Sequence, residues 1–168
     1  MNITGVIITF NEERNIERCI QSLKKECGKI IVLDSFSTDR TEEICRMHNV
    51  TFIQHAFDGH IQQKNRALKL ADTDWVLSLD ADEALTDELS ASILNVKVNP
   101  SAQAYAFNRL TNYCGHWVKH CGWYPDTKTR LVMKDRAHWT GVNPHDRLEL
   151  IQPGKVETLN GDLLHYSY

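Results

Sequence analysis

The 168-residue sequence lacks several features that would place it outside ordinary globular proteins. It contains only 8 glycines and 4 prolines, and hydrophobic residues make up 42%, so the composition excludes collagen-like and disordered chains. No apolar run approaches the roughly 20 residues that cross a bilayer, and the N-terminus lacks the basic flank and cleavage site of a signal peptide. The formal net charge of −3 provides no basic excess for a nucleic-acid binder. We therefore expect a cytoplasmic globular protein with no nucleic-acid partner.

The glycine-rich loops that bind phosphate through backbone N–H groups are also missing. The sequence has neither GxxxxGK[ST] nor GxGxxG. A nucleotide would therefore need a metal ion and side chains, and Lys64, Asn65 and Arg66 supply two cations and an amide. The same segment, QQKNRALK, is equally compatible with a solvated helix face.

Cysteine is sparse, and its five copies are odd in number, which favours reduced thiols over a disulfide framework. One cluster could be read as a zinc site, because Cys and His are zinc ligands and four of them complete a tetrahedron. Zinc sites usually have two separated ligand pairs, whereas these four residues fall within eight positions. This spacing argues against zinc at Cys114, His116, His120 and Cys121.

Strand-like and helix-like patterns alternate through the first hundred residues. Short apolar runs at 3–10, 30–33, 51–53 and 75–79 are separated by helical periods at 16–23, 61–71 and 87–99. Asp39 and Glu42 form a plausible capping box for one more helix, ending near His48. This alternation predicts an α/β fold with a mostly parallel sheet and helices on both faces.

The pattern changes after Pro100, where helical periodicity nearly disappears. Residues 104–110 and 129–134 read as strands, and an aromatic, His-rich loop lies between them. No linker rich in Gly, Ser or Pro separates the halves, so we expect one domain over 1–168 with a mixed-sheet C-terminal extension.

The segment LSLDADE carries the most informative polar residues. In open α/β sheets, ligands bind beyond the carboxyl ends of the strands, and Asp80 and Asp82 follow an apolar strand. Two carboxylates two positions apart can face one divalent ion, such as Mg²⁺ or Mn²⁺, whose open positions a diphosphate fills. The alternative is a solvated acidic turn that begins the next helix.

Several ordered motifs resemble those of family 2 glycosyltransferases with the GT-A fold. They are ITFNEERNI (8–16), VLDSFSTDRT (32–41), QKNRAL (63–68) and WVLSLDADE (75–83). The later GWYPDTKTRL (122–131) and GDLLHYSY (161–168) resemble the bacterial lipopolysaccharide-core β-glucosyltransferase subgroup. The resemblance implies a Rossmann-like three-layer sandwich. It also implies metal-dependent, inverting transfer of a hexose, with glucose expected, from a UDP-sugar to a glycan or glycolipid such as lipopolysaccharide core.

The resemblance also assigns roles to individual residues. It places Asp82 and His165 at the metal or diphosphate, although a lone His near apolar residues is more often a hydrogen-bonded core group. Many relatives have two aspartates where this chain has Asp34 and Ser35, which weakens the assignment of uracil. The donor-binding positions are Thr9, Asn11, Glu12, Asp34, Lys64, Asn65, Asp80 and Ala81.

An inverting transfer needs a base that accepts the proton of the acceptor hydroxyl. Asp146 in NPHDRLEL is the preferred candidate and Asp126 in WYPD the second, and either could instead cap a loop or pair with an arginine. On the acceptor side, Trp123 and Tyr124 could stack on sugars and His116 could meet phosphates. The competing interpretation of this loop is a lid packed on the sheet.

The resemblance divides the chain by function. Residues 1–100 would bind the nucleotide sugar and 101–168 would face the acceptor. The subgroup commonly continues with a helical region, which we expect to be missing here, and membrane attachment could reside in it. Peripheral association with the inner face of the bacterial inner membrane is therefore part of the expectation. Two alternatives stay open: a catalytically silent nucleotide-sugar-binding module, and a sugar-phosphate nucleotidyltransferase, which needs an early Gly-rich loop.

Overall fold

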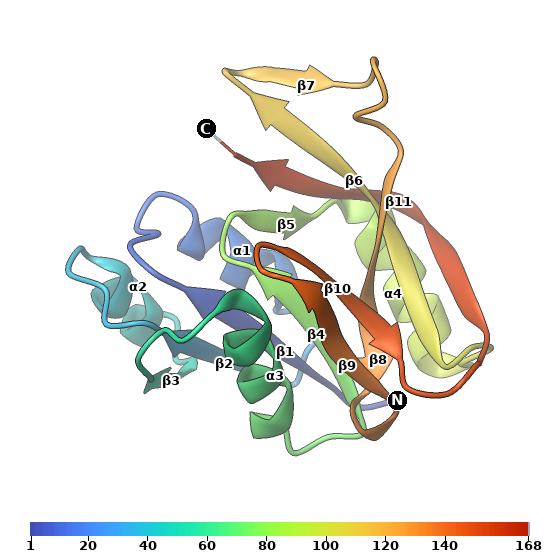
Figure 1. Cartoon of the computed structure of the whole chain (residues 1–168), viewed down its shortest axis with the longest axis horizontal. Helices are drawn as coiled ribbons and strands as arrows, with labels where there is room; N and C mark the ends of the chain where they lie inside the picture. Colours follow the sequence, from blue (N-terminus) through green and yellow to red (C-terminus); the bar gives the residue numbers. More distant parts are fainter. Residues whose placement is uncertain (168) are drawn as a thin grey trace.

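Figure 1 shows the fold in a computed structural model, which describes residues 1–167. Tyr168, the last residue of the C-terminal motif, lies outside the described residues. The first half consists of three β–α units and a fourth strand, and its four strands lie parallel in the order β3-β2-β1-β4. The elements are β1 (Ile3–Thr9), α1 (Ile16–Leu23), β2 (Lys29–Asp34), α2 (Thr41–Met47), β3 (Thr51–Gln54), α3 (His60–Leu70) and β4 (Trp75–Asp80).

The elements that follow β4 extend the same sheet to nine strands. Strand β8 pairs antiparallel with β4, and β6, β11 and β5 follow, with β7 on the free part of β6. The elements are β5 (Glu83–Leu85), α4 (Asp87–Val98), β6 (Ala104–Tyr113), β7 (His116–Val118), β8 (Asp126–Met133), β9 (Ala137–Val142), β10 (His145–Leu150) and β11 (Val156–Tyr166). The expected mixed-sheet extension is confirmed, because β6 and β11 are parallel while their other pairings are antiparallel.

Two apolar layers cover the sheet. On one face, α1, α2 and α4 pack on alternate strand residues such as Ile7, Val32 and Leu77. On the other face, α3 and the β9–β10 hairpin cover Val6 and Val76. Because successive strand residues point to opposite faces, near-continuous apolar strands are buried on both sides. The predicted α/β fold with helices on both faces is confirmed.

The structure corrects three local predictions. The capping box at Asp39 is wrong: Arg40 is the N-cap of α2, and Asp39 accepts hydrogen bonds from the backbone of Thr41 (3.0 Å) and Glu13 (3.1 Å). Asp39 thus joins the loop at Glu13 to the first residue of α2, although Arg40 occupies the N-cap position. The strand predicted at 129–134 begins earlier, at Asp126, and five strands were not predicted: β5, β7, β9, β10 and β11. Strand β5 is only three residues long. The other four have exposed or half-buried positions, so polar residues interrupt their apolar runs.

Candidate active site

The carboxyl ends of the parallel strands meet above a cavity of about 400 Å³. The strand register places Thr9 beside Asp34, and Ile8 beside Asp80. Polar residues at the ends of β1, β2 and β4 therefore lie together at one edge of the sheet. The cavity is lined by Ile8, Thr9, Phe10, Glu12, Ser35, Phe57, His60, Lys64, Asp80, Ala81, Asp82, Pro144, Asp146 and His165.

A buried lysine joins two carboxylates at this cavity. Lys64 Nζ lies 2.9 Å from Asp80 Oδ1 and 2.7 Å from Asp146 Oδ2, and its side chain is only 7% exposed. Burial alone would raise the pKa of Asp80, but Lys64 and Arg130 outweigh it and hold this pKa well below its usual range. The ion pairs thus keep Asp80 ionised and draw Asp146, from the distant β10, to the end of β4.

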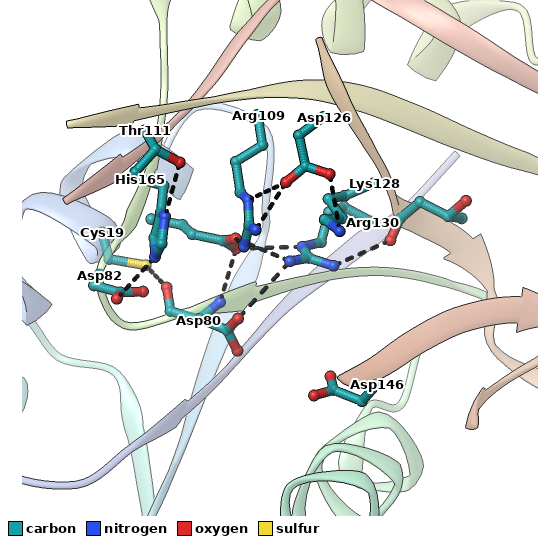
Figure 2. Close-up of polar contacts among 12 residues, drawn as sticks. Cys19, Asp80, Asp82, Arg109, Thr111, Asp126, Lys128, Arg130, Asp146 and His165 are labelled. Atoms are coloured by element: carbon teal, nitrogen blue, oxygen red, sulfur yellow. Dashed lines mark hydrogen bonds and ion pairs between the residues drawn. The ribbon is translucent and has the colours of Figure 1, made fainter. Parts of the chain in front are cut away.

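A second buried ion pair supports the acidic motif from behind. Arg130 donates two hydrogen bonds to Glu83, at 3.2 and 2.9 Å, and Glu83 also accepts the backbone N–H of Asp80 at 3.1 Å. Asp80 also lies close to Arg130, and Arg109 binds Asp126 (Figure 2). Arg109 lies 3.6 Å from Glu83 and so connects the two groups. Since Glu83 and Arg130 are almost fully buried, they fix the turn that carries the aspartates.

Asp82 and His165 form the other polar pair of the cavity. His165 Nε2 lies 3.2 Å from Asp82 Oδ2, and the other ring nitrogen lies 3.2 Å from the hydroxyl of Thr111. The backbone N–H of Tyr166 also donates to the carbonyl of Asp82 at 2.8 Å. Strand β11 and the acidic turn therefore hold these side chains together (Figure 2).

The Asp82–His165 pair fits a divalent cation that a substrate also binds. A carboxylate oxygen and an imidazole nitrogen face the cavity together, and Mg²⁺ in particular often takes few protein ligands beside substrate phosphates. Within residues 1–167, no group of three or more His, Cys, Asp or Glu is arranged to hold a metal ion. The remaining ligands would therefore have to come from substrate and water.

Two further groups complete the cavity. The hydroxyl of Thr9 is buried and has no hydrogen-bond partner within the described part of the chain. A ligand can therefore satisfy it, because an unpaired buried hydroxyl is unfavourable. Burial raises the pKa of Glu12, which also accepts a hydrogen bond from Asn15.

Three predicted donor-binding residues lie outside the cavity lining. Asn11 Oδ1 accepts the backbone N–H of Thr38 at 2.8 Å, and Asp34 accepts that of Ser37, also at 2.8 Å. Asn65 binds the backbone of Trp139 through both ends of its amide. All three side chains are engaged in holding loops or strands.

The second candidate base, Asp126, also lies outside the cavity lining. Arg109 binds its carboxylate at 3.0 and 2.8 Å, and Lys128 lies at 3.0 Å. Burial would raise its pKa, but hydrogen bonds and charges from Lys128 and Arg109 lower it. The geometry therefore favours Asp146.

The predicted acceptor-side residues lie on or beside the arm that β6 and β7 form away from the main body (Figure 1). His116 and Trp123 are exposed, and Trp123 packs edge-on against Tyr113 with ring centroids 6.0 Å apart. Tyr124 instead donates a hydrogen bond to Asp162 at 2.7 Å. None of the three lines the cavity.

The cysteines are free throughout residues 1–167. Cys19, Cys27 and Cys45 are buried, as their apolar surroundings predict, while Cys114 and Cys121 are exposed on the arm. Burial raises the pKa of Cys27 and Cys45 to about 12.

Sequence reasoning missed the residues that organise the site from beneath. Glu83 ends the segment LSLDADE and Arg130 lies in GWYPDTKTRL, but the sequence pattern assigns neither a role. The signal was the single arginine within the apolar end of β8, since a buried arginine requires a buried carboxylate. Trp139 was missed altogether, although it packs beneath Lys64 Nζ, with 4.3 Å between Nζ and the ring centroid.

Comparisons with known proteins give the family. The profile described as glycosyl transferase family 2 matches residues 4–148. An uncharacterized glycosyltransferase of Rickettsia bellii is 36% identical over 175 aligned residues, covering 98% of this chain and 60% of its own length. The lipopolysaccharide core biosynthesis glycosyltransferase LpsC of Rhizobium meliloti is 33% identical over 92 residues, covering 52% of this chain and 34% of its own. The chain thus spans about 60% of the length of the Rickettsia relatives it matches.

Solved structures give the fold. Residues 1–349 of TarS from S. aureus, in complex with UDP-GlcNAc, superpose with a TM-score of 0.69 at 15% identity, covering 100% of this chain and 59% of that one. Glucosyl-3-phosphoglycerate synthase from Mycobacterium tuberculosis, with Mn²⁺ and UDP, gives a TM-score of 0.53 at 23% identity, covering 68% of this chain and 44% of that one.

No helix among residues 1–167 is both long and apolar enough to cross a membrane. With the profile extending over most of its length and the GT-A architecture matched, the chain belongs to glycosyl transferase family 2.

Proposed function

We propose that this protein transfers a hexose, with glucose the first candidate, from a UDP-sugar to a glycan or lipid-linked glycan, with inversion at the anomeric carbon. The observation that carries the proposal is the convergence of Asp80, Asp82, Asp146 and His165 on one cavity at the carboxyl ends of the strands. LpsC, a relative named for lipopolysaccharide core biosynthesis, motivates the acceptor class. The UDP and UDP-GlcNAc complexes of the structural neighbours motivate the donor.

The donor would lie across the ends of β1, β2 and β4. Thr9 and Glu12 line the part of the cavity next to Ser35, where the base and ribose fit, and Asp80 with Ala81 lines the floor. A divalent cation held by Asp82 and His165 would neutralise the charge that the diphosphate gains as the sugar leaves. Lys64 adds a buried positive charge beside Asp80.

Asp146 is the proposed general base. Inversion requires the acceptor oxygen to attack from the face opposite the diphosphate, so the base must come from another side of the cavity than the metal ligands. Asp146 enters from β10, whereas Asp82 and His165 come from the acidic turn and β11 (Figure 2). Its carboxylate would accept the proton of the acceptor hydroxyl as the new glycosidic bond forms.

The second half of the chain would face the acceptor. The exposed rings of Tyr113 and Trp123, together with His116, suit the sugars and phosphates of a glycolipid. Peripheral association with the inner face of the bacterial inner membrane would bring a lipid-linked acceptor to this arm. The assignment of residues 1–100 to the donor is part of the same proposal, although Asp146 and His165 reach the shared cavity from the second half.

A thermal-shift screen tests the donor assignment first. Ligands that bind only the folded state raise apparent stability by RT ln(1 + [L]/Kd). We expect UDP-glucose with Mn²⁺ to raise the Tm. GDP-mannose with Mn²⁺ should raise the Tm less, and so should UDP-glucose when EDTA replaces Mn²⁺. A shift that is equal for every nucleotide sugar, or equal with EDTA, would contradict the assignment.

Turnover then separates an enzyme from a silent binding module. Labelled UDP-glucose is incubated with lipopolysaccharide core acceptor, and transfer of label to the lipid fraction is measured. If the wild type forms product and Asp146→Asn does not, the result supports a glycosyltransferase with Asp146 as its base. Donor binding without any product would instead support the silent module.

A further inference from the structure

The hairpin that carries Asp146 is not part of the main sheet. Strands β9 and β10 pair only with each other, as a separate two-stranded sheet that packs on α3. Trp139 is paired with Leu148, and Gly141 with Asp146, so these residues lie on the same, inward face of the hairpin. The position of the Asp146 carboxylate therefore depends on how the hairpin is attached to α3.

Asn65 makes this attachment in the middle of the hairpin. Its Nδ2 donates to the carbonyl of Trp139 at 2.9 Å, and its Oδ1 accepts the N–H of Trp139 at 2.8 Å. One side chain thus satisfies both backbone groups of one residue, as a neighbouring strand would. Lys64, the preceding residue of α3, holds Asp146 itself at 2.7 Å.

A second attachment lies at the tip of the hairpin. Asn143 Oδ1 accepts the N–H of Ile61 at 2.9 Å, and its Nδ2 donates to Gln62 Oε1 at 3.2 Å. The first N–H groups of a helix have no partner within the helix, and Gly59, the N-cap of α3, supplies no side-chain acceptor. Gly59 has φ +133°, a backbone conformation that residues with a Cβ rarely adopt, so glycine is favoured where the hairpin tip meets α3.

We propose that Asn65 is a positioning residue that sets where Asp146 lies in the cavity, and that it does not bind the donor. The inference rests on the proposed function, in which Asp146 is the base. Asn65 lies outside the cavity lining, and both ends of its amide are occupied by Trp139. Since a misplacement of about 1 Å can cost about 100-fold in rate, freeing the hairpin should slow the chemical step.

The test compares Asn65→Ala with two other variants. We expect Asn65→Ala to lower kcat by about 100-fold, while the Kd for UDP in Mn²⁺, measured by calorimetry, stays within about twofold of wild type. Asn143→Ala loosens the same hairpin from its tip, so it should also lower kcat and leave UDP affinity intact. Asn95→Ala, at an exposed helix position whose side chain makes no described hydrogen bond, is the matched control and should behave as wild type.

Two outcomes of the kinetic and binding measurements would overturn the inference. Asn65→Ala could weaken UDP binding as much as it lowers kcat, which would indicate a donor-binding residue. Alternatively, Asn65→Ala could keep the wild-type kcat. Hydrogen exchange at the Trp139 amide gives a readout that needs no turnover. Faster exchange in Asn65→Ala than in wild type supports the attachment, and unchanged exchange overturns it. If the wild type transfers no sugar, the proposed function fails, while this exchange still decides the role of Asn65.

Discussion

At the scale of single residues, the site depends on charges that are buried and paired. Asp80 and Asp146 share Lys64, and Glu83 holds both Arg130 and the backbone of Asp80. A buried ion pair need not stabilise a protein relative to apolar residues, but the loss of one partner leaves an uncompensated charge. These residues thus orient Asp80 and Asp146 at the cavity, and the burial of their charges is offset only while the ion-pair network is intact.

The variant Glu83→Gln tests whether the loss of one buried partner destabilises the protein. We expect the free energy of unfolding to fall by about 3–5 kcal/mol, because Arg130 would retain its charge without its closest carboxylate. Chemical denaturation followed by circular dichroism measures the change. Glu149→Gln is the matched control, since the Arg147–Glu149 pair is exposed and such pairs contribute about 0–1 kcal/mol. Equal losses in the two variants would show that the buried pair has no special role.

At the scale of elements, strand β11 joins the acidic turn to the second half of the chain. It pairs with β6 and β5 and carries His165 next to Asp82. Its register with β6 shifts between Thr158 and Asp162, and Gly161 lies in this irregular stretch with φ +98°. A Cβ at Gly161 would lie 2.2 Å from the backbone nitrogen of Leu89 in α4.

Gly161→Ala should therefore displace β11 from the first turn of α4. We expect a loss of at least about 1–3 kcal/mol of stability, the usual cost of an unfavourable backbone conformation. Denaturation midpoints give the measurement. Gly28→Ala serves as the control, because a Cβ there meets nothing within 4 Å. If Gly161→Ala had the same denaturation midpoint as Gly28→Ala, the close approach of β11 and α4 would be contradicted.

The elements of the first half could be predicted from sequence because apolar runs and helical periods are local signals. Ile16, Cys19, Ile20 and Leu23, for example, are the buried face of α1. The hairpin at 137–150 was not predicted, because its inward face carries Gly141 and Asp146 as well as Trp139 and Leu148. Gly141 and Asp146 interrupt the apolar alternation that is typical of a half-buried strand. Its attachment to α3 uses the backbone of Trp139, which leaves no trace in sequence.

Part of the site could also be predicted from the sequence. The motifs that contain Asp80, Asp82, Asp146 and His165 indicate residues of one site, and the four side chains line one cavity. Asn65 adjoins Lys64 in the same motif, yet its side chain turns to the hairpin. Motif position identifies the region of a residue, whereas only the packing of β9 on α3 determines which way its side chain points.

At the scale of the whole molecule, one sheet brings distant parts of the chain to a single cavity. Strands β1 and β4 contribute the floor, while β10 and β11 contribute Asp146 and His165 from the second half. The central claim is that this cavity binds a nucleoside diphosphate through a cation held by Asp82 and His165.

Calorimetric titration of UDP into the protein, with Mn²⁺ or with EDTA, tests that claim most directly. We expect UDP to bind about tenfold or more tightly with Mn²⁺ than with EDTA, equivalent to about 1.4 kcal/mol. This gain should disappear in Asp82→Asn and shrink in His165→Gln. UDP affinity that is the same with Mn²⁺ and EDTA, or a gain that Asp82→Asn retains in full, would show that Asp82 and His165 hold no cation for the diphosphate.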